Sequence, residues 1–191
     1  MGGHHLILGK TTDFLSGREI EDNHDERYRQ KIARLLVGKK GFAKEEIESR
    51  IKIELRTAAG RRGSIWLDFK ITIKDRVMMI IKYGPGSIIT RQTPAIAISR
   101  LIEPYQIPFV VVTNGEDAVI IDGESGSIIS SDISSGLDSI PDRLSLEKKY
   151  SSYYFPPIRE RTVEMAGRLV YAYEIDGSCP CDENICRLPD E

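Results

Sequence analysis

Two alternating segments joined by a tight turn constrain the fold of this chain more than any other feature. In the first, Ser64 to Lys74, every second residue is apolar, and the second, Val77 to Lys82, is apolar almost throughout. The intervening Lys74-Asp75-Arg76 turn joins them as a hairpin. Because the strictly alternating segment Ile51 to Leu55 comes shortly before, the sequence predicts an antiparallel meander of three strands.

Alternation also assigns the side chains of the middle strand to two faces. The apolar residues at odd positions are expected to share the core face: Ile65, Leu67, Phe69, Ile71 and Ile73. Asp68, at an even position, is expected on the opposite face together with Trp66. In the third strand, Ile80 and Lys82 share a face by the same period.

Asp68 and Lys82 form the skeleton of a metal-dependent nuclease site, with an acid on one strand and a lysine on its hairpin partner. In such sites a second acid stands two residues before the lysine. The two carboxylates then hold a divalent cation through oxygen, while the ammonium group steadies the attacking water or the phosphate. Here that position is Ile80, whose side chain cannot ligate magnesium. The sequence therefore predicts a nuclease fold with a damaged or relocated metal site.

Four helices are expected around the meander. Glu26 to Gly38 has apolar residues three and four positions apart and acids near its start, as an amphipathic helix favours. Thr93 followed by proline is a favoured helix start, which predicts a helix from Pro94 to Glu103. Nearer the carboxyl terminus, Leu144 to Tyr154 and Ile158 to Tyr173 are predicted to form a helical hairpin.

Further strands complete an α/β fold. Phe109 to Thr113 is a continuous apolar run typical of a strand covered on both faces. Ala118 to Asp122 and Ser127 to Ser131 follow it as hairpin strands. The chain is expected to contain four parts: an arm at 1–25, the main domain at 26–130, a linker with a helical extension at 131–175, and a Cys-rich tail at 176–191.

The order of these features resembles the amino-terminal nuclease domain of type I restriction enzyme R subunits, within the PD-(D/E)XK superfamily. Beyond the Asp68 and Lys82 strands, the resemblance rests on Glu26-Arg27-Tyr28-Arg29-Gln30-Lys31-Ile32 and on Val111-Val112-Thr113-Asn114-Gly115. It covers roughly Glu26 to Gly126. It implies a restriction-endonuclease-like α-β-β-β-α-β core with a mixed sheet, here followed by the helical extension and the tail.

The resemblance implies roles only where residues match. Asp68 matches the metal-binding aspartate, Lys82 the catalytic lysine, and Glu26 an acid of the first helix that assists the metal in some members. Ile80 departs from the expected glutamate, and the place expected for a glutamine on the following helix holds no amide, although Gln92 lies just upstream. Since no carboxylate occurs between Lys82 and Glu103, Glu54 is the best candidate for a relocated acid and Glu26 is the next. The alternatives for Asp68 are an exposed strand acid or a partner for Arg61 or Lys82.

Basic residues gather at a hairpin tip and a helix end: Arg61, Arg62, Lys39 and Lys40. Phosphate contacts from such groups give affinity without sequence information. The net charge of −2 provides no global basic field. A solvated loop is therefore a strong alternative to a nucleic-acid contact for these residues.

Three thiols lie in the tail at Cys179, Cys181 and Cys186. Thiolates this close together suggest zinc or an iron-sulfur cluster, with a fourth ligand from His24, Asp182, another chain or water. An exposed tail with free thiols is the alternative.

Three hypotheses follow. The first is a DNA-binding or assembly domain with a degenerate metal site, whose partners are DNA and other restriction-modification subunits. The second is an active Mg²⁺-dependent DNA endonuclease with a relocated acid, and the third is a metal-binding interaction protein that uses the cysteine tail. No apolar run approaches the roughly 20 residues of a membrane helix, and a cytoplasmic location is expected.

Overall fold

A computed structural model describes residues 7–56, 60, 62–130, 133–176 and 185–187. Its main sheet has the strand order β3-β4-β5-β6-β7-β8. The strands are β3 (Ile47–Arg56), β4 (Arg62–Ile73), β5 (Arg76–Tyr83), β6 (Phe109–Thr113), β7 (Ala118–Asp122) and β8 (Ile128–Ser130). β5 and β6 run parallel and the other neighbours antiparallel, so the predicted meander and mixed sheet are confirmed. A short strand, β9 (Ile185–Arg187), pairs with β4.

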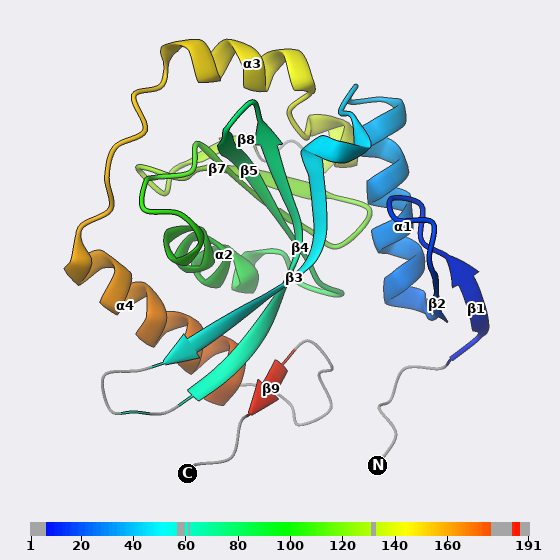
Figure 1. The fold of residues 1–191 in the computed structure, drawn as a ribbon, viewed down its shortest axis with the longest axis horizontal. Helices are drawn as coiled ribbons and strands as arrows, with labels where there is room; N and C mark the ends of the chain where they lie inside the picture. Colours follow the sequence, from blue (N-terminus) through cyan, green and yellow to red (C-terminus); the bar gives the residue numbers. More distant parts are fainter. Residues whose placement is uncertain (1–6, 57–59, 61, 131–132, 177–184, 188–191) are drawn as a thin grey trace.

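Helices cover both faces of this sheet (Figure 1). They are α1 (His24–Gly38), α2 (Ile89–Ile102), α3 (Arg143–Ser152) and α4 (Glu160–Val170). Three shorter helical turns are η1 (Lys44–Glu46), η2 (Ile133–Ser139) and η3 (Tyr171–Asp176), the last of which is a π-turn that continues α4. The element order α1, β3, β4, β5, α2, β6 and the two carboxyl-terminal helices agree with the sequence expectation.

α1 begins close to the predicted residue, and α2 does not. Asn23 caps α1 by accepting a hydrogen bond from the Glu26 backbone N–H at 2.8 Å. α2 begins at Ile89, so the predicted start at Pro94 is wrong and the proline lies inside the helix. An extra turn forms ahead of it, because the Arg91 guanidinium bonds the Pro85 carbonyl and its backbone N–H bonds the Ile88 carbonyl.

Two hydrophobic clusters lie on opposite faces of the sheet. The α1 cluster contains Ile32 and Leu36 of α1 with Met79 and Ile81 of β5. The α2 cluster contains residues of α2, α4 and η3 together with Ile80. Both clusters are almost fully buried, so each face of β5 is covered by its own layer of helices.

The apolar residues of β4 divide between these clusters at Asp68. Those before it belong to the α2 cluster and those after it to the α1 cluster: Ile65 and Leu67, then Phe69, Ile71 and Ile73. The expectation that all five share one face is therefore wrong. The β3–β4 ribbon bends sharply and leaves the rest of the sheet (Figure 1). Strong coiling of a two-stranded ribbon, with Arg50 at a positive φ of 54°, turns its two halves to different sides.

The predicted arm is ordered where the structure describes it. β1 (Gly9–Thr12) and β2 (Glu19–Asp22) form an antiparallel hairpin beside α1 (Figure 1). Most of the predicted Cys-rich tail lies outside the described residues. Within the described part of the chain, no helix has both the length and the apolar character needed to cross a membrane.

Candidate functional site

Asp68 is buried at 4% exposure and both of its carboxylate oxygens accept hydrogen bonds. Oδ1 accepts from Arg29 Nε at 2.8 Å, and Oδ2 accepts from the backbone N–H of Tyr83 at 2.7 Å. The backbone pairing of β4 with β5 ends at Phe69 and Ile81. Beyond that point the Asp68 side chain, rather than the β4 backbone, accepts the bond from the Tyr83 N–H. The carboxylate is therefore held between α1 and the end of β5.

Arg29 supplies the positive charge at Asp68. Its side chain is 15% exposed, and its Nη1 lies 3.9 Å from Oε2 of Glu26. Burial opposes the charge of Arg29, but the Asp68 carboxylate outweighs it and raises the pKa of the guanidinium above its ordinary value. The guanidinium also lies 5.5 Å from the ring centre of Tyr83. A permanent internal cation thus contacts both Asp68 and Glu26.

Further polar side chains connect Glu26 to the amino-terminal hairpin. Gln30 Nε2 donates to Glu26 Oε1 at 2.8 Å and to Asp13 Oδ1 at 2.7 Å, and Arg50 contacts both acids. Burial acts to raise the pKa of Asp13, but hydrogen bonds from Ser16 and Gln30 outweigh it and lower that pKa below its ordinary value. Glu26 is therefore one member of a polar network that reaches from the arm to β3.

Tyr83 closes this network on the sheet side. Its hydroxyl donates to Asp25 Oδ1 at 3.0 Å, and its ring stacks on Tyr28 with centres 5.8 Å apart. Burial, followed by the charge of Asp25, raises the pKa of Tyr83 well above its ordinary value. No pattern in the sequence had marked Asp13, Asp25 or Tyr83 as site residues.

Lys82 has partners different from those of Asp68. Its Nζ donates to the Trp66 carbonyl at 2.8 Å and lies 3.8 Å from Oε2 of Glu174 on η3, and its side chain is 3% exposed. Its neighbour Ile80 is fully buried in the α2 cluster. No ion pair joins Lys82 to Asp68 in the described part of the chain. The lysine turns toward η3 and the aspartate toward α1, so the structure does not bring them into one shared ion pair.

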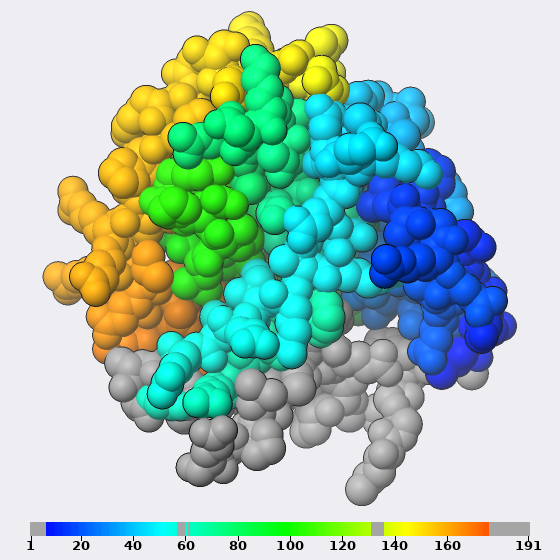
Figure 2. Space-filling model, viewed as in Figure 1, coloured from blue at the N-terminus to red at the C-terminus, as the bar shows by residue number. Residues whose placement is uncertain are grey.

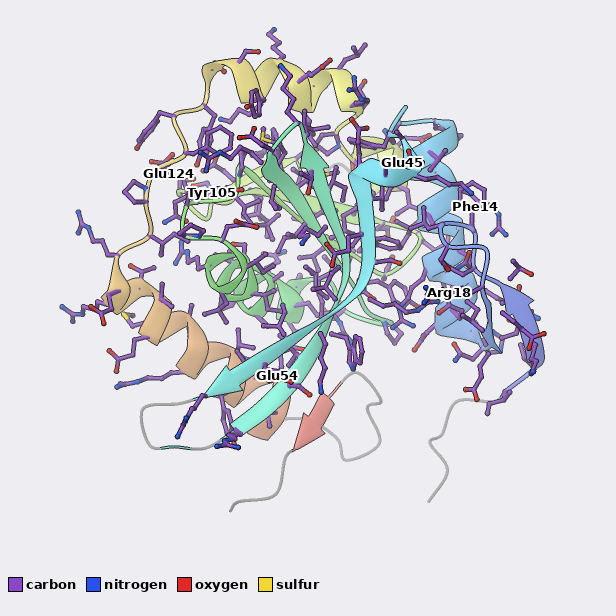
Figure 3. All side chains as sticks on the ribbon, in the orientation of Figure 1. Phe14, Arg18, Glu45, Glu54, Tyr105 and Glu124 are labelled. Carbon is purple, nitrogen blue, oxygen red and sulfur yellow. The ribbon has the colours of Figure 1, made fainter. Side chains whose placement is uncertain are left out.

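Among the described residues, no group of three His, Cys, Asp or Glu side chains is arranged to hold a metal. The position before Lys82 is an apolar core residue, Ile80, and Arg29 already bonds Asp68. Glu54, the candidate relocated acid, has a side chain 75% exposed and lies 3.7 Å from Lys52. It projects from the part of β3 that leaves the sheet, apart from α1 (Figure 3).

The residues predicted to contact nucleic acid lie at two separate places. Lys39 is 3.6 Å from Asp138 Oδ1, and Lys40 Nζ donates to the Asp138 carbonyl at 2.7 Å, so both fasten the end of α1 to η2. Arg62 is exposed on β4, directly opposite Arg56 in register. Arg61 lies outside the described residues.

The predicted thiol ligands cannot be placed as a site. Cys179 and Cys181 lie outside the described residues. The backbone of Cys186 pairs with Ser64 in the β9–β4 ladder.

Two cavities in the described part of the chain lie away from Asp68. One of about 250 Å³ lies between α2 and α4 and is lined by Arg100 and Met165 among others. One of about 220 Å³ lies between β3 and α4. Neither is lined by Asp68, Glu26 or Lys82.

Comparison with known proteins gives one match. A family model described as "Type I restriction enzyme R protein N terminus (HSDR_N)" matches residues 24–141, from the start of α1 to the end of η2. This span is more than half of the 191 residues. No curated protein and no solved structure matches the chain.

Proposed function

This chain belongs to the family of type I restriction enzyme R protein N termini, and from that premise we propose that it is a DNA-binding or assembly domain whose catalytic metal site has degenerated. Its partners are DNA and other subunits of a restriction-modification system. The observation that carries the proposal is the bond between Arg29 and Asp68 at 2.8 Å. It puts a fixed side-chain cation against the acid that the family resemblance assigns to the metal.

The energetics of this pair favour loss of metal binding. A divalent cation at Asp68 must displace a buried guanidinium whose charge would then lose its closest carboxylate. Ile80 offers no replacement ligand. The site therefore exchanges metal chemistry for an internal ion pair that joins α1 to β4.

DNA contacts in this proposal come from local basic groups rather than from net charge. Arg62 and Arg56 form a pair of exposed cations at the outer end of the β3–β4 hairpin. Arg61 adjoins Arg62 in sequence. Cations of this kind bind phosphates without reading sequence and give an affinity that falls steeply with salt.

The second candidate is an active Mg²⁺-dependent endonuclease in which Glu54 or Glu26 replaces the missing acid. Glu26 favours it, because it is 5% exposed and contacts the same arginine as Asp68. The third, a metal-binding protein built on the cysteine tail, rests on residues outside those described. Elemental analysis with a Cys181→Ser variant tests it separately.

A plasmid-nicking assay with Mg²⁺, run on the wild type, Asp68→Ala and Glu54→Gln, tests the degeneracy. We expect no metal-dependent nicking by any of the three. Nicking by the wild type that disappears in Asp68→Ala would overturn the proposal in favour of the enzyme, and a further loss in Glu54→Gln would identify the relocated acid.

Anisotropy of a labelled duplex, titrated at increasing KCl, tests DNA binding. We expect weak, salt-sensitive binding that Arg62→Glu reduces. Arg161→Glu on α4 is the matched control, an exposed arginine remote from the hairpin tip in sequence. Equal loss in both variants, or no binding at low salt, would contradict the assignment of the hairpin.

A further inference from the structure

The cavity of about 250 Å³ between α2 and α4 lies on the side of the sheet that carries the α2 cluster. α4 packs against α2 (Figure 1) and lies at the surface of the molecule, in orange in Figure 2. The lining residues follow one stripe on each helix, from Thr93 to Arg100 on α2 and from Thr162 to Leu169 on α4. The cavity is therefore built by two facing helices.

Two alanines form the buried end of this cavity. Ala97 of α2 and Ala166 of α4 are each 2% exposed, and both line the cavity. Their short side chains leave a space between the helices that larger residues would fill. Met165, which is 54% exposed, lies at the rim, so the space opens toward the surface.

Arg100 is partly buried, and among the described residues that line the cavity it alone is charged. Its Nε is shielded from solvent and has no hydrogen-bond acceptor in the described part of the chain. The α4 acid Glu164 bonds Arg168 and lines the other cavity. Since a buried donor without an acceptor costs free energy, an anion that supplies the acceptor gains more here than at an exposed arginine.

The other lining residues restrict the kind of anion. A single guanidinium matches one carboxylate through two parallel N–H···O bonds, whereas a phosphate group carries up to two negative charges and would meet one cation. The walls are apolar at Ile96, Met165 and Leu169. The volume lies below the range of roughly 300–1,000 Å³ for sites of drug-sized ligands. These features favour a small molecule with one negative charge and an apolar body.

We propose that this cavity binds a small organic monocarboxylate. The carboxylate lies on Arg100, and the apolar body lies against Ile96, Met165 and Leu169, above the two alanines. None of these residues belongs to the Asp68 network or to the β3–β4 hairpin. The proposal therefore does not rest on the proposed function.

An NMR titration of the full chain, labelled with ¹⁵N, tests the site with sodium benzoate in a constant excess of NaCl. We expect the backbone resonances of Ala97 and Ala166 and the side-chain Nε–H resonance of Arg100 to shift together and saturate. The dissociation constant should be about 0.1–10 mM, as expected for a ligand of this size. Benzamide has the same shape without the charge and should bind about tenfold more weakly or worse.

Two pairs of variants isolate the role of charge. Arg100→Gln should abolish the benzoate shifts and keep its fold, because it removes a donor that has no acceptor in the described part of the chain. Arg161→Gln, an exposed arginine of α4 outside the lining, is the matched control and should bind as the wild type does. Met165→Glu puts a carboxylate of the chain itself at the rim and should weaken benzoate binding about tenfold or more, whereas its neutral match Met165→Gln should weaken it far less. This second pair decides the question if Arg100→Gln does not fold.

Saturable shifts on both helices that depend on Arg100 would support the proposal. Absence of shifts at these residues, equal binding of benzamide, or unchanged binding by Arg100→Gln or Met165→Glu overturns it. Equal binding of inorganic phosphate also overturns it, because a site for any anion makes no use of the apolar walls. Tighter binding of N-acetylaspartate amide than of benzoate overturns it in favour of an acidic side chain from a partner protein.

Discussion

The two charged residues that the sequence pairs, Asp68 and Lys82, have contrasting surroundings. Asp68 belongs to a polar network in which arginine, glutamine and tyrosine side chains link several acids between α1 and the sheet. Lys82 lies against the α2 cluster with one backbone carbonyl and one acid, Glu174, at 3.8 Å. Asp68 pairs with Arg29 and Lys82 lies near Glu174, so neither group needs the other as its counter-charge.

Under the proposed function, the acid and the lysine persist in the sequence without a shared metal chemistry. An acid and a lysine on paired strands cooperate only if both side chains point into one space. Here the ribbon coils at Asp68, and the two groups turn toward different helical layers. The buried charges then stabilise packing between layers, because a buried ion costs free energy unless it is paired and hydrogen-bonded.

The largest expected effect comes from restoring the missing acid. Ile80→Glu puts a carboxylate into the fully buried α2 cluster, and we expect the free energy of unfolding to fall by roughly 3–5 kcal/mol, without any gain of Mg²⁺-dependent nicking. Ile80→Val, which should cost about 0.5–1.5 kcal/mol, is the control for lost volume. Chemical denaturation with and without Mg²⁺ measures this. If Mg²⁺ stabilises Ile80→Glu but not the wild type, the carboxylate introduced at position 80 and Asp68 do share a metal site.

A smaller loss is expected from breaking the Asp68 ion pair. Asp68→Ala removes the carboxylate that Arg29 Nε and the Tyr83 N–H bond, which should cost about 3 kcal/mol, and Arg29→Met in the same chain should recover part of it. A double-mutant cycle measures the coupling. Lys82→Met provides the contrast on the other face: its effect should add to that of Asp68→Ala, because the two side chains share no partner among the described residues. Strong non-additivity between Asp68→Ala and Lys82→Met would break the comparison.

The smallest effect concerns acid stability. Because the pKa of Asp13 is lowered in the folded protein, its contribution to stability is present above its unfolded pKa and is lost as the pH falls through the folded value. The wild type should therefore lose stability below about pH 4 more steeply than Asp13→Asn, which itself costs roughly 1 kcal/mol at neutral pH. Urea denaturation across this range checks the sign. Parallel pH profiles would mean that Asp13 adds nothing through its charge.

Much of the fold follows from local patterns. The Lys74-Asp75-Arg76 turn, the apolar run of β6 and the amphipathic pattern of α1 each involve neighbouring residues, and these elements occur as expected. The predicted start of α2 at Pro94 was wrong, because Arg91 bonds the Pro85 and Ile88 carbonyls and so forms an extra helical turn before the proline. Candidate site residues were found where a residue type was unusual for its element, as with Asp68 in a strand. Asp13 and Arg50 carried no such signal, since acids in an arm and arginines in an edge strand are ordinary.

The sequence by itself determined the order of elements, the family to which residues 24–141 belong, and the aliphatic residue two positions before Lys82. Only the tertiary structure decided that Arg29, 39 positions away in the chain, bonds Asp68, and that Lys82 turns toward Glu174 instead. The reason is physical. Alternation fixes faces only while a strand stays regular, and the coiling of a long ribbon and the approach of distant helices depend on how the whole core packs.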